Sequence, residues 1–339
     1  MEKNQLILSV KDLNIQFNLR GKALHAIRGI DLDIYHGEVL AIVGESGSGK
    51  SVFTKSFMGL LDSNGSITSG TIDYFGADDH QPIRLSALKK EKDWLKVRGH
   101  EIAMIMQDPM TSLNPVYTVG YQISEMILRH EKVSKKEARA RAIEMLRLVN
   151  IPAPEKRIDE YPHELSGGMR QRVMIAMALS CNPELLIADE PTTALDVTIQ
   201  AQILDLMRTL KQTLNTSIMM ITHDLGVVAE MSDYVLVMYA GMVMEYSDVR
   251  SLFADPLHPY TQGLLKALPR MGESQEKLYV IDGVVPSLYE LPTGCRFWPR
   301  CAYATERCKH EIPALYEVEG RKIRCFRYEN GVKEAGSHE

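Results

Sequence analysis

The strongest constraint on the fold is a glycine-rich segment that lies between an apolar run and a stretch with helical spacing. Residues Glu38–Val43 form a nearly continuous apolar run, which is typical of a buried parallel strand. The next segment, Gly44–Ser51, has the sequence GESGSGKS and fits the pattern G-x-x-x-x-G-K-[ST]. Apolar residues then recur at helical spacing from Val52 to Leu61. A strand, a glycine loop and a helix in this order predict a phosphate-binding loop.

The residue types of this loop suit the phosphates of a nucleotide. The glycines allow backbone N–H groups to curl around phosphate oxygens, and the helix N-terminus adds about half a positive charge. Lys50 is expected to bind the outer phosphates, and the hydroxyl of Ser51 is expected to coordinate Mg²⁺. The candidate cofactor residues are Gly44, Glu45, Ser46, Gly47, Ser48, Gly49, Lys50 and Ser51. A glycine-rich turn without a ligand is the alternative, and the flanking strand and helix argue against it.

Further apolar runs are short enough to be buried strands, and they alternate with segments of helical spacing. They are Ile102–Met106, Leu185–Ala188, Ser217–Ile221 and Tyr234–Met238. Helices are predicted over Ser134–Leu148 and Tyr260–Leu268. The alternation predicts an α/β fold with a mainly parallel sheet covered on both faces. Near the amino terminus, Leu6–Val10 and Asn14–Leu19 alternate apolar and polar residues, which predicts two short strands joined as an antiparallel hairpin.

Composition shifts suggest how the chain is organised. Residues 108–165 interrupt the strand pattern with a helical insert, in which Ser134–Leu148 is rich in Lys, Ala, Arg and Glu. The two prolines of Asp255–Pro259 predict a boundary between a first domain, residues 1–254, and a C-terminal extension, residues 255–339. Beyond its first helix, this extension is expected to be irregular.

Polar side chains directly follow several of the predicted strands. Asp189 and Glu190 stand at the carboxyl edge of a parallel sheet, where ligands collect. Asp189 is expected to hold Mg²⁺ through water, and Glu190 to polarise the water that attacks the γ-phosphate. Gln107 is expected to contact Mg²⁺ or that water. His223 is expected to bind the γ-phosphate and to orient Glu190.

Each of these residues also has an ordinary structural explanation. Asp189 and Glu190 precede Pro191, as in a helix cap. Gln107 fits a surface turn, and a lone histidine such as His223 is more often structural. The glycine loop upstream and the shared position at strand ends favour the catalytic interpretation.

A third motif lies between the loop and the two carboxylates. Leu165–Arg172 has the sequence LSGGMRQR, in which Ser166, Gly167 and Gly168 open a helix. The N-terminal amides of a helix form an anion site. The three motifs in this order resemble the ATP-binding cassette (ABC) family, and the resemblance covers about residues 5–250.

The resemblance implies a P-loop nucleotide-binding domain with an antiparallel N-terminal β subdomain and a helical subdomain. It implies ATP and Mg²⁺ as cofactors. It also implies that Ser166–Gly168 face the γ-phosphate held by a second subunit, and that Ala194-Leu195-Asp196 link the two sites. The family commonly stacks an aromatic ring on adenine at the position of His25; an imidazole can stack, and an exposed loop histidine is the alternative.

Gln107–Pro115 and Leu257–Thr261 narrow the resemblance to the D-type ATPase subunit of the oligopeptide, dipeptide and nickel importers. This branch implies ATP hydrolysis that drives uptake of di- or oligopeptides. The implied partners are a distinct F-type ATPase subunit, two transmembrane permease subunits and, indirectly, an extracytoplasmic peptide-binding protein. The alternatives are import of nickel or another small solute and, in a different class, a soluble ATPase of DNA repair or translation.

Bulk properties agree with a peripheral subunit of a membrane complex. The net charge of -5 argues against a nucleic-acid partner, because no basic excess is present to offset phosphates. No apolar run approaches the ~18 residues of a spanning helix. The amino terminus lacks the pattern of a signal peptide. We therefore expect the protein at the cytoplasmic face of the cell membrane, held there by its partners.

Four of the five cysteines gather near the end of the chain: Cys295, Cys301, Cys308 and Cys325. Disulfides are not expected in a reducing compartment, so the cluster suggests a metal. The spacings lack the C-x₂-C units of structural zinc and the ligand count suits a [4Fe–4S] cluster, which some peptide-importer D subunits carry in this tail. Zinc and unliganded thiols are the alternatives, and a redox-sensing module is a possible added role.

The residues around these cysteines also have expected roles. Gly294 and Pro299 would shape the site, and aromatic side chains would shield it: Phe297, Trp298 and Phe326. Cationic side chains would offset the negative charge of the cluster: Arg296, Arg300 and Arg324. The sequence offers no route from this site to the ATP chemistry.

Overall fold

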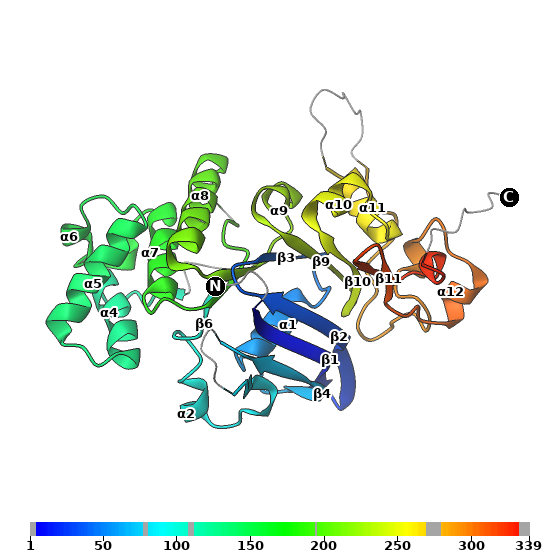
Figure 1. Ribbon diagram of the computed structural model, residues 1–339, viewed down its shortest axis with the longest axis horizontal. Coiled ribbons are helices and arrows are strands. Elements are labelled where there is room, and N and C mark those ends of the chain that lie inside the picture. Colours follow the sequence, from blue (N-terminus) through cyan, green and yellow to red (C-terminus); the bar gives the residue numbers. More distant parts are fainter. Residues whose placement is uncertain (1–4, 77–80, 108–111, 194, 269–278, 332–339) are drawn as a thin grey trace. The chain divides into compact units, whose positions relative to one another are not determined.

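The computed structural model describes residues 5–76, 81–107, 112–193, 195–268 and 279–331 (Figure 1). Asp108–Thr111 and Ala194, which belong to two of the predicted motifs, lie outside the described residues. The chain divides into two compact units, and each is described by itself. The first comprises residues 1–8, 33–39 and 73–221, and the second residues 9–32, 40–72 and 222–339.

An antiparallel N-terminal sheet has the strand order β2-β1-β4-β5. Its strands are β1 (Leu6–Leu19), β2 (Lys22–Tyr35), β4 (Gly65–Tyr74) and β5 (Ile83–Arg84). The prediction of two strands over Leu6–Val10 and Asn14–Leu19 is wrong, because both segments belong to the single strand β1. The break in the sequence pattern coincides with Asp12, whose φ of 44° is accommodated inside the strand. The hairpin partner of β1 is β2.

The main sheet is mixed. In the first unit, β6 (Ile102–Ile105), β7 (Leu185–Asp189) and β8 (Ser217–Ile221) pair in parallel. Every residue of β7 and β8 is buried, as expected for parallel strands covered on both faces. In the second unit, β3 (Val39–Val43) pairs in parallel with β9 (Tyr234–Tyr239). These five strands confirm the predicted buried strands to within one or two residues.

Antiparallel strands extend the main sheet in the second unit. They are β10 (Met242–Asp248), β11 (Tyr316–Val318) and β12 (Arg321–Ile323). Strand β10 pairs with both β9 and β12, and β12 pairs with β11. The expectation of an irregular tail is therefore wrong for the β11–β12 hairpin, which joins the last part of the chain to the sheet through β10.

The four longest described helices of the first unit begin at polar residues whose side chains cap them. The unit contains α2 (Glu91–Trp94), α4 (Val119–His130), α5 (Lys135–Leu148), α6 (Pro154–Arg157), α7 (Gly167–Leu179) and α8 (Val197–Leu214). Short 3₁₀ turns lie at Leu85–Ala87 and Pro162–Glu164. Ser134 accepts a hydrogen bond from the N–H of Glu137 at the start of α5, and Asp196 accepts one from Ile199 at the start of α8. The predicted helix Ser134–Leu148 is confirmed, with Ser134 as its cap.

The described helices of the second unit have eight residues or fewer. They are α1 (Lys50–Phe57), α9 (Leu225–Met231), α10 (Val249–Ala254), α11 (Pro259–Lys266) and α12 (Glu306–His310), with 3₁₀ turns at Trp298–Arg300 (η3) and Phe326–Tyr328 (η4). The predicted helix Tyr260–Leu268 corresponds to α11. Among the described helices, none is both long and apolar enough to cross a membrane.

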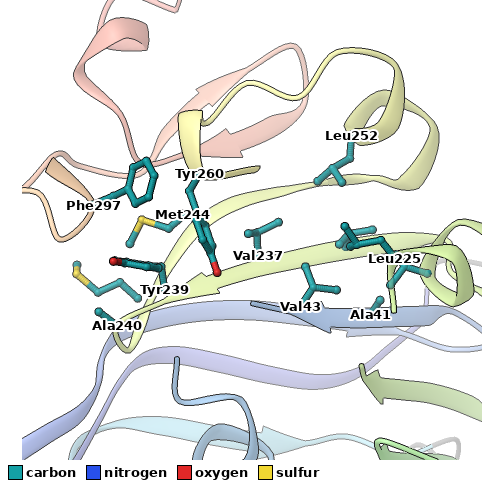
Figure 2. Close-up of a cluster of buried hydrophobic side chains, with 13 residues drawn as sticks. Ala41, Val43, Leu225, Val237, Tyr239, Ala240, Met244, Leu252, Tyr260 and Phe297 are labelled. Atoms are coloured by element: carbon teal, nitrogen blue, oxygen red, sulfur yellow. The ribbon is translucent and has the colours of Figure 1, made fainter. Parts of the chain in front are cut away.

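An aromatic core fixes the C-terminal extension within the second unit. Tyr239 of β9, Tyr260 of α11 and Phe297 meet with ring centroids 4.8–5.4 Å apart (Figure 2). All three side chains are at most 2% exposed. Aromatic pairs of this kind add about 0.5–1.5 kcal/mol each beyond the area that they bury. The extension therefore packs as part of the core of this unit.

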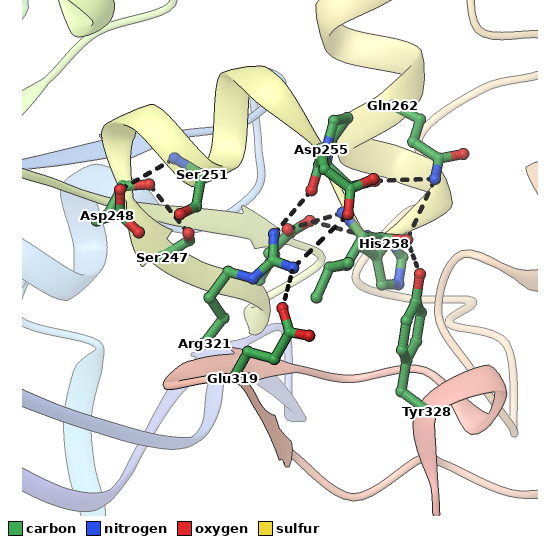
Figure 3. Close-up of polar contacts among 12 residues, drawn as sticks. Ser247, Asp248, Ser251, Asp255, His258, Gln262, Glu319, Arg321 and Tyr328 are labelled. Carbon is green, nitrogen blue, oxygen red and sulfur yellow. Dashed lines mark hydrogen bonds and ion pairs between the residues drawn. The ribbon is translucent and has the colours of Figure 1, made fainter. Parts of the chain in front are cut away.

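A polar network lies beside that core (Figure 3). His258 caps α11 by accepting the N–H of Tyr260, and Arg321 of β12 donates to the carbonyl of Asp255 at 2.8 Å. The hydroxyl of Tyr328 donates to the carbonyl of Leu257 at 3.1 Å. The hairpin and η4 are thus hydrogen-bonded to the segment that leads into α11.

Candidate active site

The glycine loop lies between β3 and α1 in the second unit, as predicted. Gly49 is the N-cap residue of α1 and has a φ of 100°, a conformation that favours glycine. The side chain of Lys50 is buried, and its ammonium donates to the carbonyls of Gly44 at 2.7 Å and Glu45 at 3.1 Å. The Lys50 side chain therefore contacts the backbone of its own loop. Ser46 and Gly47, at the crest of the loop, are exposed.

The predicted carboxylates lie at the end of β7 in the first unit. Asp189 is 5% exposed. The carboxylate of Glu190 accepts two hydrogen bonds on the same oxygen, Oε2, from the Gln107 amide at 2.8 Å and from the Thr193 hydroxyl at 2.9 Å. The structure thus brings Gln107 and Glu190 together, although 83 residues separate them. Thr193 is a contact that the sequence motifs did not single out.

The backbone at Glu190 has an unusual conformation. Its φ of 48° lies in the left-handed region, where a residue with a side chain costs about 1–3 kcal/mol. Its N–H donates to the carbonyl of Ile221 at the end of β8, 2.9 Å away, and its carbonyl accepts from the N–H of Thr193 at 3.2 Å. These bonds hold the side chain just beyond the edge of the sheet.

The first residues of the third motif, Leu165–Gly168, form a turn that opens α7 and is called the signature turn below. The hydroxyl of Ser166 accepts the N–H of Met169 at 3.3 Å, and Gly167 is the first residue of the helix. Arg170 supports the turn by donating its Nε–H to the carbonyls of Pro162 at 2.8 Å and Leu165 at 3.0 Å. Ser166 and Gly167 are exposed, so the N-terminus of this 13-residue helix faces solvent.

The remaining nucleotide-site candidates lie in the second unit. His223 is exposed and follows Thr222, directly after β8. His25, on β2, contacts the Gln16 amide through its ring nitrogen Nε2 at 2.7 Å. Burial and the nearby Arg28 charge lower the pKa of His25. The lowered pKa favours the neutral imidazole, the form suited to stacking on a base as the family resemblance implies.

Two family models match the chain. One, described as "ABC transporter", matches residues 27–193, and another, "Oligopeptide/dipeptide transporter, C-terminal region", matches residues 244–308. A relative from Bacillus subtilis, "Oligopeptide transport ATP-binding protein AppD", is 52% identical over 95% of this chain and 97% of its own. The chain belongs to the ABC transporter ATPases of the oligopeptide/dipeptide branch.

Other relatives place the chain in the same branch. "Dipeptide transport ATP-binding protein DppD" of Escherichia coli (strain K12) is 50% identical over 94% of this chain and 96% of its own.

Among solved structures, the ATP-binding cassette MJ0796, a dimer with ADP and Pi, is 27% identical over 72% of this chain and 99% of its own, with a TM-score of 0.62. The CbiO1 protein of Clostridium perfringens is 32% identical over 74% and 92%, with the same TM-score. The predicted family and ABC fold are confirmed.

All four C-terminal cysteines line one cavity of about 210 Å³ within the second unit of this ABC ATPase. Gly294 brings the first and third of them together, because a Cβ at this position would lie 2.2 Å from the carbonyl of Cys308. The N–H of Cys295 donates to that same carbonyl at 2.8 Å. The predicted aromatic shield is present, since Phe297, Trp298 and Phe326 also line the cavity.

The thiols of the cavity are held mainly in their neutral form. Burial raises the pKa of Cys301 to about 11 and that of Cys325 to about 12, and it raises the pKa of Cys295 as well. Neighbouring cysteines contribute to each of these increases. Within the described ranges, however, no group of three or more His, Cys, Asp or Glu side chains is arranged so that it could hold a metal ion.

The predicted cationic partners of the cysteines differ in where they lie. Arg307 and Arg327 line the cavity, and Arg296, Arg300 and Arg324 do not. The charges of Arg296 and Arg324 nevertheless interact with the Cys295 thiol. Arg300 instead forms an ion pair with Glu45 of the glycine loop. The C-terminal extension thus contacts the glycine loop directly, a contact that the sequence analysis did not predict.

Proposed function

We propose that this protein is the ATP-hydrolysing subunit of an importer for di- or oligopeptides, with Glu190 as the residue that polarises the attacking water. The observation that carries the catalytic part is the Glu190 carboxylate, held at the end of β7 by the Gln107 amide and the Thr193 hydroxyl. General-base assistance requires a carboxylate of fixed orientation within reach of the water. The "ABC transporter" and peptide-transporter models support the coupling to import.

The other residues bind and orient the nucleotide. Lys50 moves from its loop carbonyls to the β- and γ-phosphates, and the loop amides surround them. Ser51 and Asp189 hold Mg²⁺, Asp189 through water, and Gln107 senses the metal or the water. His223 binds the γ-phosphate, and His25 stacks on adenine. The donor types of these residues, a hydroxyl, a carboxylate and an amide, suit Mg²⁺.

The active site is completed by a second ATPase subunit. The exposed N-terminus of α7, with Ser166, Gly167 and Gly168, offers amides and a positive helix end to the γ-phosphate of ATP held by that partner. Leu195 and Asp196 connect the two sites. The dimeric form of the related cassette MJ0796 supports this arrangement. We propose a distinct F-type homologue as the partner.

The helical insert receives the permease. A groove of about 460 Å³ in the first unit is lined by Thr118, Gly120, Tyr121, Ser124, Glu125, Leu128, Lys135 and Arg139. Tyr121 and Leu128 are 49% and 37% exposed, so their apolar surface is open to a partner. A short permease helix with apolar residues fits this mixed lining. Two such permeases hold the protein at the cytoplasmic face of the membrane, and an extracytoplasmic peptide-binding protein delivers the substrate to them.

Transport by the complete importer in proteoliposomes tests the substrate class. We expect ATP-dependent uptake of a labelled dipeptide or oligopeptide, with no uptake of ⁶³Ni²⁺. Nickel uptake without peptide uptake would favour the small-solute alternative instead. Copurification of the protein with DNA-repair or ribosomal complexes, and not with permeases, would contradict the transport function altogether.

We further propose that Cys295, Cys301, Cys308 and Cys325 hold a [4Fe–4S] cluster, with zinc as the alternative. Four thiols around one cavity match the ligand set of such a cluster. Within the described residues no group of side chains is arranged to hold a metal ion, so the thiols would have to close around either occupant. When bound, the cluster would cross-link the extension and respond to redox conditions.

Iron analysis of anaerobically purified protein tests this assignment. We expect a brown protein that absorbs at about 400 nm and contains about four irons per chain. Cys325→Ser should lose the iron. Cys181→Ser is the matched control, because Cys181 is buried next to Met126, outside the cavity, and should leave the iron content unchanged. Stoichiometric zinc without iron would contradict the cluster.

A further inference from the structure

Arg300 of the C-terminal extension forms a two-point ion pair with Glu45, the second residue of the glycine loop. Its two terminal nitrogens lie 2.6 Å from Glu45 Oε2 and 3.0 Å from Glu45 Oε1. The two residues are 255 positions apart in the sequence, and both belong to the second unit. The Arg300 side chain is 4% exposed. A fork-to-fork pair of this kind fixes both distance and orientation.

Every donor of the Arg300 guanidinium has an acceptor. Its Nε–H donates to the carbonyl of Asp282 at 3.0 Å, and its terminal nitrogens also donate to the carbonyl of Ile281 at 3.1 Å and to the hydroxyl of Tyr239 at 3.3 Å. With the two bonds to Glu45, these contacts account for the five N–H groups of an arginine. The bonds to Asp282, Ile281 and Tyr239 thus orient the guanidinium independently of its bonds to the loop.

The extension holds Glu45 at a second point. The backbone N–H of Glu45 donates to the hydroxyl of Tyr260 at 2.8 Å. Tyr260 is fully buried and packs against Tyr239 and Phe297 in the aromatic core (Figure 2). Both the side chain and the backbone of Glu45 are therefore held by rigid parts of the C-terminal half of the unit.

Glu45 is in turn connected to the lysine of the loop. Its carbonyl accepts the Lys50 ammonium at 3.1 Å and the N–H of Ser48 at 3.2 Å. A displacement of Glu45 would move the carbonyl that accepts the Lys50 ammonium. It would also disturb the turn closed by the Ser48 N–H, which contains the exposed residues of the loop. Arg300 therefore contacts Glu45, and Glu45 in turn contacts Lys50, the group expected to bind phosphate.

The turn that carries Arg300 is bracketed by two of the cavity cysteines. In η3, the N–H of Trp298 donates to the carbonyl of Cys295 at 3.1 Å, and the N–H of Cys301 donates to the carbonyl of Trp298 at 3.2 Å. The position of Arg300 is therefore set by the same short segment that places two thiols at the cavity.

We propose that Arg300 is a positioning residue for nucleotide binding: through Glu45, it holds the glycine loop and Lys50 in the conformation that accepts the phosphates. The extension thereby sets the affinity for ATP without touching the nucleotide. The inference rests on the proposed function to the extent that residues 44–51 bind the phosphates of ATP.

Titration of the full chain with Mg²⁺-ATP tests this role. We expect Arg300→Ala and Glu45→Gln each to weaken ATP binding roughly tenfold, in the range of couplings between distinct sites. The double variant should bind about as weakly as either single variant, because both substitutions break the same contact. Arg300→Lys, which keeps the charge and loses the fork, should recover part of the affinity.

The matched control is Arg84→Ala. This substitution removes another two-point pair, between Arg84 and Asp73, whose nitrogen–oxygen distances are 2.8 and 3.2 Å and whose arginine is more exposed. The pair belongs to the first unit and the loop to the second, and the substitution should leave ATP affinity unchanged. A merely structural Arg300 would lower the denaturation midpoint in the same way as other core substitutions without lowering ATP affinity at a temperature where the protein is folded.

Lys50→Ala separates failure of the inference from failure of the proposed function. If Lys50→Ala weakens binding while both Arg300→Ala and Glu45→Gln bind normally, the positioning role is overturned and the nucleotide site stands. Additive effects in the double variant would also overturn it. If Lys50→Ala leaves ATP affinity unchanged, the nucleotide role of the loop fails, and the inference fails with it. Should Arg300→Ala not fold, Glu45→Gln tests the same contact from the other side.

Discussion

At the scale of single residues, the proposed chemistry depends on how Glu190 is held. Its left-handed backbone is stabilised by the bonds to Ile221 and Thr193, and its carboxylate is oriented by the Gln107 amide and the Thr193 hydroxyl. Strained non-glycine residues concentrate at functional sites, because the surrounding structure must compensate for them. The carboxylate therefore starts near the orientation that a general base requires.

We expect Glu190→Gln to retain ATP binding and to lower hydrolysis by about 10²–10⁴-fold, since glutamine keeps the shape but cannot accept a proton. Steady-state ATP turnover of the assembled complex and a nucleotide titration measure the two effects. Glu184→Gln is the control: Glu184 directly precedes the same strand, at its opposite end, and accepts a hydrogen bond from Tyr74. Near-normal turnover of Glu190→Gln would rule out the assignment.

The sequence predicted these residues because strand ends can be recognised locally. Asp189, Glu190 and Gln107 each follow a buried run, and parallel strands bring such positions to one edge. Thr193 and Arg300 were not predicted as partners, because their contacts depend on how distant segments fold together. Arg300 was assigned to the cysteines on proximity in sequence, whereas the folded chain places its guanidinium against Glu45.

At the scale of elements, short strands were the hardest to predict. Strands β11 and β12 have three residues each and include the charged Glu317, Arg321 and Lys322. No alternating pattern can be recognised over such a length. Their pairing with β10 comes from tertiary contacts: Ile323 is fully buried, and Arg321 donates to Asp255. Longer elements such as α5 were predicted to within one residue because their periodicity spans several turns.

The histidine that caps helix α11 links the stability of the protein to pH. His258, its capping residue, is 1% exposed, and burial lowers its pKa to about 3 from 6.5. The unfolded chain takes up a proton on this residue below pH 6.5, whereas the folded chain does so only near pH 3. Its contribution to the free energy of unfolding is therefore unfavourable at low pH, by about 1.4 kcal/mol for each unit between these values.

We expect His258→Asn to make the stability less dependent on pH between 6.5 and 3. Asparagine is a good helix cap and takes up no proton in this range. Denaturation midpoints measured across the pH range give the slope of stability against pH. A loss of stability that is the same at every pH, caused by the smaller side chain, does not change this slope. The same substitution at exposed His163 is the control. An unchanged slope for His258→Asn would contradict the burial of a neutral imidazole.

At the scale of the whole molecule, the proposed function depends on a second subunit. The glycine loop belongs to one unit of the chain, and the signature helix α7, with its exposed N-terminus, to the other. The sequence motifs predicted this division of roles only through the family resemblance. The residue pattern of a single chain does not indicate whether its signature turn contacts the ATP of the same chain or the ATP of a partner subunit.

We propose that this chain needs a partner cassette for hydrolysis, and ATP turnover against partner concentration tests this requirement most directly. The chain is first measured alone, at concentrations where light scattering shows a monomer, and then with increasing amounts of the second ATPase subunit. We predict near-background turnover by the monomer and a rise that saturates as the two subunits pair. Full turnover by the monomer, unaffected by the partner, would contradict the account.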